Sequence, residues 1–191
     1  MDVTNKRPGI MDTKALSRRI EKPIVLVGMM GVGKSSVGRR LATALHCPFV
    51  DADDAIEESA HMTIPEIFDS FGEDYFRDGE RRVIARLIEE DRGCKVIATG
   101  GGAFCNEGTR KLILDKAIAV WLDSDIDTLV ERTSRKDNRP LLNQGDPREI
   151  LARLRAERHG DYSQAPIHVM SGKGPHNETI DKVLRGIDQW L

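Results

Sequence analysis

The sequence predicts an α/β protein in which a parallel β-sheet is covered by helices on both faces. Short β-branched apolar runs recur along the chain, and segments with apolar residues three and four positions apart separate them. Strands and helices that alternate in this way form a parallel sheet, since each crossing helix brings the chain back to the start of the next strand. With 191 residues, 39% of them hydrophobic, the chain is long enough for one domain with its own core. We therefore expect three layers, α/β/α, around a five-stranded sheet.

Five apolar runs are predicted strands because they are short and bounded by Pro, Gly or polar residues. The first follows Pro23 and reads IVLV, the continuous apolar pattern of a strand buried on both faces. The second ends in acidic residues, and the third ends at three consecutive glycines. The predicted strands are 24–27, 48–51, 95–99, 117–122 and 167–170.

The predicted helices lie between these strands and after the last one. Pro147 stands at a plausible first-turn position, and the closing helix places Ile180, Val183, Leu184 and Ile187 at helical spacing. The predicted helices are 36–45, 54–60, 64–71, 74–90, 107–115, 125–134, 147–159 and 177–191. Residues 1–20 are polar and of mixed charge, which predicts a flexible N-terminal tail ending in a short helix over 13–20. We predict that residues 21–191 form a single domain.

Residues 28–35, GMMGVGKS, match the G-x-x-x-x-G-K-[ST] pattern of a phosphate-binding loop. The loop follows the first predicted strand and precedes a helix, which is the context that this pattern requires. Its glycines let successive N–H groups converge on an anion, and the helix start adds unpaired donors and a positive dipole. Lys34 supplies a cation for the β- and γ-phosphates, and the Ser35 hydroxyl is a hard ligand suited to Mg²⁺. The sequence therefore predicts a site for a nucleoside triphosphate with magnesium.

Two carboxylates, Asp51 and Asp53, follow the second predicted strand. In a parallel sheet this edge also carries the phosphate loop. One carboxylate is suited to hold magnesium, and the other to bind or deprotonate an acceptor hydroxyl. The alternative is that one of them caps the helix that follows.

Two further patterns point to a bound substrate. Arg77 and Glu80 are three residues apart on a predicted helix, so that they can face each other. An arginine held by a carboxylate is suited to grip an anion, although a solvated surface pair has the same spacing. Gly100, Gly101 and Gly102 weaken regular structure, which indicates backbone that approaches a ligand closely; a tight turn is the alternative.

A basic stretch interrupts the helical pattern after the fourth strand. We interpret it as a mobile flap whose arginine closes over the transferring phosphoryl group, with an exposed basic loop as the alternative. Arg158 and Tyr162, near the end of the next predicted helix, suggest a second grip on an anion. The cations of the basic stretch are Arg132, Arg135, Lys136 and Arg139.

Composition excludes several classes of protein. The net charge of −2 argues against a general nucleic-acid-binding protein. No apolar run approaches the ~20 residues of a membrane span, and the N-terminus lacks the apolar segment of a secretory signal. Three cysteines without a C-x-x-C pair favour reduced thiols over a metal site. We expect a cytoplasmic protein, with a charge balance that fits a monomer and no nucleic acid or membrane as partner.

Together these motifs resemble those of the shikimate kinase family, in the nucleoside-monophosphate-kinase-like branch of phosphate-loop (P-loop) proteins. The resemblance runs from about residue 22 to residue 191. Each motif is modest by itself, but the ordered set is highly specific. The motifs are GMMGVGKSS at 28–36, DAD at 51–53, TIPEIF at 63–68, FRDGE at 76–80, TGGG at 99–102, RPLL at 139–142 and R-x-x-x-Y at 158–162.

The resemblance implies that ATP, with Mg²⁺, phosphorylates the 3-hydroxyl of shikimate in the route to chorismate and the aromatic amino acids. It also implies a substrate-binding segment over about 51–90 and a mobile lid over about 133–147. The implied nucleotide contacts are Gly31, Val32, Gly33, Lys34, Ser35, Ser36, Arg132, which stacks on adenine, and Arg139, with the loop 171–175 on the other side of the base. The implied shikimate contacts are Asp53, Arg77, Gly101, Gly102, Arg139 and Arg158, the implied magnesium ligands are Ser35 and Asp51, and the implied catalytic residues are Lys34, Asp53 and Arg139.

Three other functions are weighed against this one. A gluconate kinase of the same fold would not need two arginines converging on a carboxylate beside a glycine floor. A GTP-dependent switch usually carries an N-K-x-D motif, which this sequence lacks. An inactive relic would be expected to have lost some of Lys34, Ser35, Asp51, Asp53 and Arg139, all of which are present.

Overall fold

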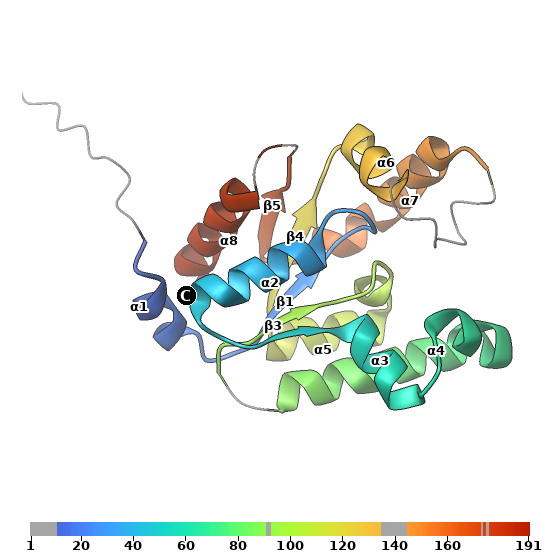
Figure 1. The fold of residues 1–191 in the computed structure, drawn as a ribbon, viewed down its shortest axis with the longest axis horizontal. Helices are drawn as coiled ribbons and strands as arrows, with labels where there is room; N and C mark the ends of the chain where they lie inside the picture. Colours follow the sequence, from blue (N-terminus) through green and yellow to red (C-terminus); the bar gives the residue numbers. More distant parts are fainter. Residues whose placement is uncertain (1–10, 91–92, 135–144, 173, 175) are drawn as a thin grey trace, which may run out of the picture.

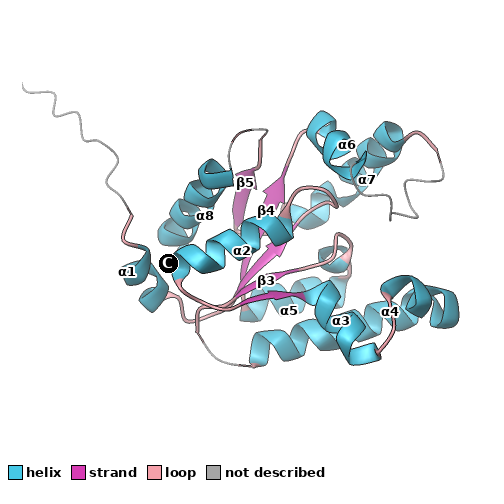
Figure 2. Cartoon of the chain, in the orientation of Figure 1, coloured by secondary structure: helices cyan, strands magenta, loops and turns pink. Residues whose placement is uncertain are grey.

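The computed structural model describes residues 11–90, 93–134, 145–172, 174 and 176–191. A five-stranded sheet forms its centre, with the strand order β2-β3-β1-β4-β5 and every neighbouring pair parallel. Helices cover both faces of this sheet, so the structure has the predicted three layers (Figures 1 and 2). The strands are β1 (Ile24–Val27), β2 (Phe49–Asp51), β3 (Val96–Ala98), β4 (Ile118–Asp123) and β5 (Ile167–Met170).

The helices pack in groups around the sheet. On one face α1, α2 and α8 pack together, and on the other α5 contacts β4 and α4. Two pairs, α3 with α4 and α6 with α7, lie on either side of the loop that follows β1 (Figure 1). The helices are α1 (Thr13–Arg19), α2 (Lys34–Leu45), α3 (Ala52–Ala60), α4 (Ile64–Glu89), α5 (Glu107–Lys116), α6 (Ile126–Ser134), α7 (Pro147–Tyr162) and α8 (His176–Trp190), with a 3₁₀ turn, η1 (Ala103–Cys105).

The core follows from the apolar runs that predicted the strands. All four residues of β1 and all six of β4 are buried. A strand inside a sheet that is covered on both faces has no solvent-facing side, which explains why these runs do not alternate with polar residues. β5 lies at the sheet edge and alternates buried with exposed residues.

Helix α4 joins two helices that the sequence predicts as separate. Its start is a capping box, in which Thr63 accepts from the backbone of Glu66 and the Glu66 carboxylate accepts from the backbone of Thr63. Gly72 interrupts it with φ 81° and ψ 177°, values outside the helical range. The kink at Gly72 is the boundary expected between 64–71 and 74–90, and the chain resumes its helix directly afterwards.

The N-terminal segment differs from the predicted tail over 1–20. Its expected short helix is present as α1, but Leu16 and Ile20 are each only 3% exposed and belong to the core. Asp12 caps the helix by accepting from two backbone N–H groups, and Arg19 pairs with Asp188 of α8. The domain therefore includes residues 12–20, because the four-residue spacing of Leu16 and Ile20 gives this polar segment one apolar face. The expectation for residues 1–10 lies outside the described residues.

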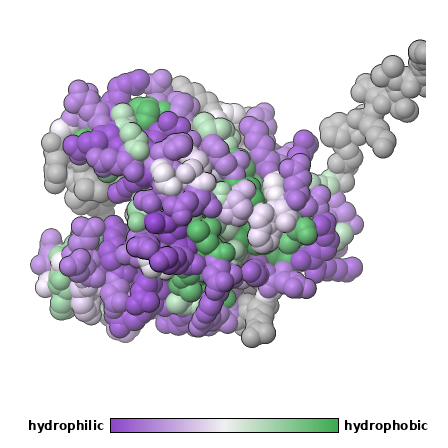
Figure 3. All heavy atoms as spheres, turned by 180° about the vertical axis from the view of Figure 1, so that it is seen from behind, coloured by the Kyte–Doolittle hydropathy of each residue, from purple (hydrophilic) through white to green (hydrophobic). Residues whose placement is uncertain are grey.

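The surface is mainly hydrophilic, as Figure 3 shows for the side opposite to that of Figure 1, with apolar side chains in small separate groups. In the described part of the chain, no helix has both the length and the apolar character needed to cross a membrane.

The packing of α1 predicts a stability difference between two faces of one short helix. We expect Leu16→Ala to lower the free energy of unfolding by about 2–4 kcal/mol, because the substitution leaves a cavity against α2. Lys14→Ala, on the exposed face of α1, is the matched control and should change it by less than about 0.5 kcal/mol. Urea denaturation measures both variants. If both substitutions changed the free energy of unfolding equally, the assignment of α1 to the domain would be contradicted.

Candidate active site

The phosphate loop connects the carboxyl end of β1 to α2. Gly28 has φ 137°, and a Cβ at this position would lie 2.2 Å from the carbonyl oxygen of Leu122, so only glycine fits. Gly33, with φ 96°, is the N-cap of α2. The positive φ angles of Gly28 and Gly33 turn the chain sharply at both ends of the loop. The loop thus leads into the N-terminus of α2, whose unpaired N–H groups can bind an anion.

Lys34 folds back along this loop and is only 8% exposed. Its Nζ donates to the carbonyl oxygens of Gly28 and Met29, at 2.7 and 2.9 Å. The ammonium group is thus held over the loop by backbone contacts, beside the amides that would receive phosphate. Arg132 approaches the same loop from α6, where its Nη1 donates to the Val32 carbonyl at 3.0 Å.

Asp51 and Ser35 meet at the edge of the sheet, where the Ser35 hydroxyl donates to Asp51 Oδ2 at 2.6 Å. The other oxygen of Asp51 accepts from the backbone of Asp53 and caps α3, so the cap occurs and leaves Oδ2 directed at Ser35. A hydroxyl and a carboxylate are hard oxygen donors of the kind that Mg²⁺ takes, with phosphates and water completing its shell. Among the described residues there is no cluster of three or more His, Cys, Asp or Glu that would hold a metal without such help.

Asp53 lies next to the glycine segment that follows β3. A Cβ at Gly100 would be 2.9 Å from Asp53 Oδ1 and 3.1 Å from Glu80 Oε1, so this segment touches both carboxylates. The pKa of Asp53 is raised to about 6, mainly by burial and then by the negative charges of Asp51 and Glu80, while the positive charge of Lys34 opposes the shift. A carboxylate with this pKa is ionised at pH 7 but is a better proton acceptor than an ordinary aspartate.

Arg77 is fixed by two carboxylates of its own helix. Its Nη1 donates to Glu80 at 2.7 Å and its Nη2 to Glu73 at 3.4 Å, so Arg77 and Glu80 face each other as their spacing predicts. Glu80 is 1% exposed, which separates this pair from the solvated pair that was the alternative. Burial raises the pKa of Glu80, and the charge of Arg77 offsets part of that effect. The guanidinium group packs on Gly102, where a Cβ would lie 2.6 Å from Nη2.

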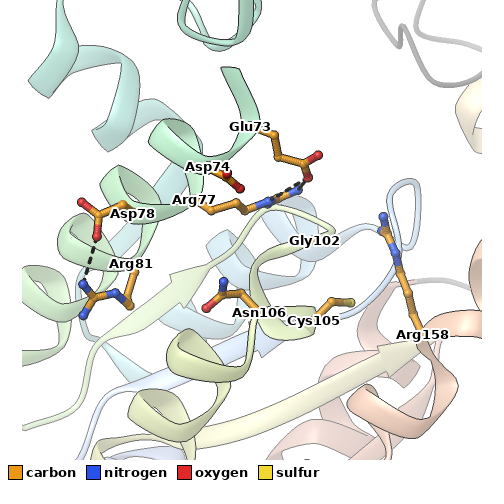
Figure 4. Close-up of a pocket in the computed structure, with 9 residues that line it drawn as sticks. All are labelled: Glu73, Asp74, Arg77, Asp78, Arg81, Gly102, Cys105, Asn106 and Arg158. Carbon is orange, nitrogen blue, oxygen red and sulfur yellow. Dashed lines mark hydrogen bonds and ion pairs between the residues drawn. The ribbon is translucent and has the colours of Figure 1, made fainter. Parts of the chain in front are cut away.

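A cavity of about 460 Å³ opens between α4, η1 and α7. Arg77 reaches into it from one side and Arg158 from the other, across Gly102 and Cys105 (Figure 4). We call it the arginine cavity. Its lining is polar and includes three arginines; Arg81 pairs with Asp78, and Arg77 and Arg158 face one space, which suits an anionic ligand. The lining residues are Glu73, Asp74, Arg77, Asp78, Arg81, Gly102, Cys105, Asn106 and Arg158.

Tyr162 does not line the arginine cavity, so the structure corrects the expectation that it grips an anion together with Arg158. The ring is 1% exposed, and its hydroxyl donates to the carbonyl oxygen of Gly101. Cys105 and Asn106 do line the cavity, and sequence reasoning missed both. A three-residue 3₁₀ turn has no periodic pattern in the sequence. These two residues could therefore have been identified only by comparing the η1 segment with related sequences.

Three further residues, Arg132, Ser36 and Arg139, were expected to contact the nucleotide. Arg132 donates to Gly172 and Ser171 as well as to the phosphate loop, and so joins the loop to the chain after β5. Ser36 is exposed in the first turn of α2. Arg139 and most of the expected lid over 133–147 lie outside the described residues, as do parts of the loop 171–175.

Comparison with known proteins identifies the family. A family model, Shikimate kinase, matches residues 30–188. The chain belongs to the shikimate kinase family. A curated shikimate kinase from Novosphingobium aromaticivorans is 66% identical over 178 residues, which cover 92% of each protein. Members of this family are kinases that use ATP as a substrate. This chain is therefore an ATP-dependent kinase as well.

Solved structures agree with this family assignment. A shikimate kinase from Acinetobacter baumannii in complex with shikimate matches with a TM-score of 0.84 and 35% identity, covering 93% of this chain and 97% of that one. A gluconokinase from Sinorhizobium meliloti 1021 matches with a TM-score of 0.62 and 20% identity, covering 90% of this chain and 94% of that one. At that identity the gluconokinase shows a shared fold and nothing about the acceptor.

The surroundings of Asp53 predict its titration. We expect its carboxyl signal, followed by NMR in protein labelled with ¹³C-aspartate, to titrate near pH 6 rather than near the ~3.9 of a free aspartate. Asp51→Asn removes one neighbouring negative charge, keeps the helix cap and should lower this pKa. Asp54→Asn, one position along the same helix, is the matched control and should leave it unchanged. An Asp53 titration near pH 4 in the unaltered protein would contradict this electrostatic description.

Proposed function

We propose that this chain transfers the γ-phosphoryl group of ATP to the 3-hydroxyl of shikimate, giving shikimate 3-phosphate and ADP. The reaction is a step in the route to chorismate and the aromatic amino acids. The observation that carries the proposal is the arginine cavity, where Arg77 and Arg158 face one space beside Gly102. Shikimate is a carboxylic acid on a ring, and two guanidinium groups are suited to hold its carboxylate while the ring lies on backbone without side chains.

The residues around the phosphate loop divide the work of the transfer. The loop amides and Lys34 hold the phosphates, and Arg132 lies against adenine. Ser35 and Asp51 would hold Mg²⁺, whose charge neutralises that of the phosphates. Asp53 orients the 3-hydroxyl and accepts its proton late in the reaction, when the bond to phosphorus has largely formed.

Arg139 completes the proposal as the arginine of the lid. The segment over about 133–147 closes over the bound substrates, and Arg139 then contacts both of them. Most of the acceleration comes from positioning and charge neutralisation, because the loose transition state of phosphoryl transfer needs little covalent help. We further propose a cytoplasmic monomer that binds neither nucleic acid nor membrane, consistent with the net charge of −2.

A gluconate kinase is the nearest alternative, since the gluconokinase named above shares the fold. Gluconate is also a carboxylate, but it is a flexible open chain. A fixed pair of arginines beside a glycine floor is better matched to a rigid ring, whose hydroxyls keep a constant distance from its carboxylate. This difference makes the acceptor the decisive measurement.

Release of ADP in a coupled assay tests the acceptor directly. With ATP and Mg²⁺ we expect shikimate to raise the rate far above the rate without acceptor, and quinate and gluconate to raise it little. Lys34→Ala should remove this activity while the circular dichroism spectrum stays unchanged. Equal rates with and without shikimate would reject the proposal, and a higher rate with gluconate would favour the alternative.

The role of Arg77 is tested by separating the two Michaelis constants. Arg77→Ala should raise the KM for shikimate by about 10- to 100-fold, the loss expected for a charge-assisted pair, and change the KM for ATP by less than about twofold. Arg82→Ala, on the same helix but outside the arginine cavity, is the matched control and should change neither. A similar rise in both constants for Arg77→Ala would mean that Arg77 acts only on the structure of α4.

A further inference from the structure

Tyr162, the last residue of α7, is a buried polar group that the proposed reaction does not use. Its ring lies near those of Trp121 and Phe104, with centroids 5.9 and 6.5 Å away, and is 1% exposed. Burial raises the pKa of its hydroxyl well above the ordinary value, so the group stays neutral and keeps its proton to donate. A ring held in this way fixes the direction of its hydroxyl, which donates to the Gly101 carbonyl.

The same carbonyl also accepts from Arg158. Arg158 Nη1 lies 3.2 Å from the oxygen of Gly101 and, one helical turn later on α7, Tyr162 donates to that oxygen too. A carbonyl oxygen has two lone pairs, so these two donors satisfy it. Tyr162 thus helps to set the position of the backbone carbonyl to which Arg158 donates at the wall of the arginine cavity, and the tyrosine oxygen also contacts the Arg158 side chain directly.

Gly101 is confined from the other side by the phosphate loop. A Cβ at Gly101 would lie 3.1 Å from the backbone nitrogen of Met30, closer than real Cβ atoms normally come. The loop itself connects β1 to α2, and Lys34 binds it through the carbonyls of Gly28 and Met29. The Gly101 peptide therefore lies between a fixed loop and a fixed tyrosine, and it carries Arg158 as its third contact.

We propose that Tyr162 is a positioning residue for the acceptor: by holding the Gly101 carbonyl, it aims the Arg158 guanidinium into the arginine cavity. The inference rests on the proposed function, in which Arg158 binds the shikimate carboxylate. Without the hydroxyl, Arg158 is the remaining donor to this carbonyl within the described part of the chain, and Arg158 also loses its contact with the tyrosine oxygen, so both the peptide and the guanidinium are less restrained. The acceptor then meets an arginine that has to be reoriented on binding, which costs affinity.

Tyr162→Phe removes the hydroxyl and keeps the ring. We expect the KM for shikimate to rise about 5- to 10-fold, while kcat and the KM for ATP change by less than twofold and the Tm falls by no more than about 4 °C. Tyr75→Phe is the matched control, because Tyr75 is 52% exposed on α4 and lies outside the arginine cavity. It should leave both Michaelis constants unchanged.

A double-mutant cycle separates positioning from a general structural effect. Arg158→Ala alone should raise the KM for shikimate more than Tyr162→Phe does, and adding Tyr162→Phe to it should raise the KM by less than a further twofold. The inference is overturned if Tyr162→Phe raises the KM values for shikimate and ATP equally, if it leaves the KM for shikimate unchanged, or if its effect persists in full in the Arg158→Ala protein. Failure of the proposed function is seen separately, in the unaltered protein, as ADP release that does not depend on shikimate.

Discussion

Three glycines after β3 set the spacing on which the whole site depends. A Cβ at Gly100 would meet Asp53 and Glu80, one at Gly101 would meet the backbone of the phosphate loop, and one at Gly102 would meet the guanidinium of Arg77. Three different elements therefore converge on one stretch of bare backbone. A side chain at any of the three positions would crowd these neighbours and force them to shift. Transfer between two bound substrates tolerates little such displacement, since the reacting atoms must lie about 3–3.5 Å apart.

Burial of charge is the second constraint. Lys34 and Glu80 are buried, and each has a polar partner: the carbonyls of the loop for Lys34, and Arg77 for Glu80. A buried ion pair contributes little to stability by itself, because desolvation cancels much of the attraction. Its value here is geometric, since Arg77 is held toward the arginine cavity before any ligand arrives, and binding then costs less ordering of the side chain. The raised pKa of Asp53 has the same origin, a carboxylate with little water and two like charges near it.

Much of the fold was predictable because apolar periodicity records which residues are buried. The five strands and the main helices occur where these patterns place them, and α4 breaks at Gly72 as its two predicted parts require. The N-terminal helix shows the limit of this reasoning. The segment was predicted to be a tail because most of its residues are polar. Two apolar residues, Leu16 and Ile20, are nevertheless buried and are enough to pack it against the core. Asp51 shows another limit: the helix cap was weighed against a functional role, but the cap uses only one carboxylate oxygen and the other meets Ser35.

By itself the sequence determined the class of fold, the phosphate loop and the family, because these depend on local spacing and on the order of motifs along the chain. Tertiary structure alone decided which distant residues share one space. Arg77 and Arg158 are 81 positions apart and face each other only because α4 and α7 flank the same end of the sheet. It also decided that Tyr162 faces the Gly101 carbonyl rather than a ligand. The direction of a side chain near a helix end depends on the rings and backbone packed around it, and no local pattern in the sequence specifies those neighbours.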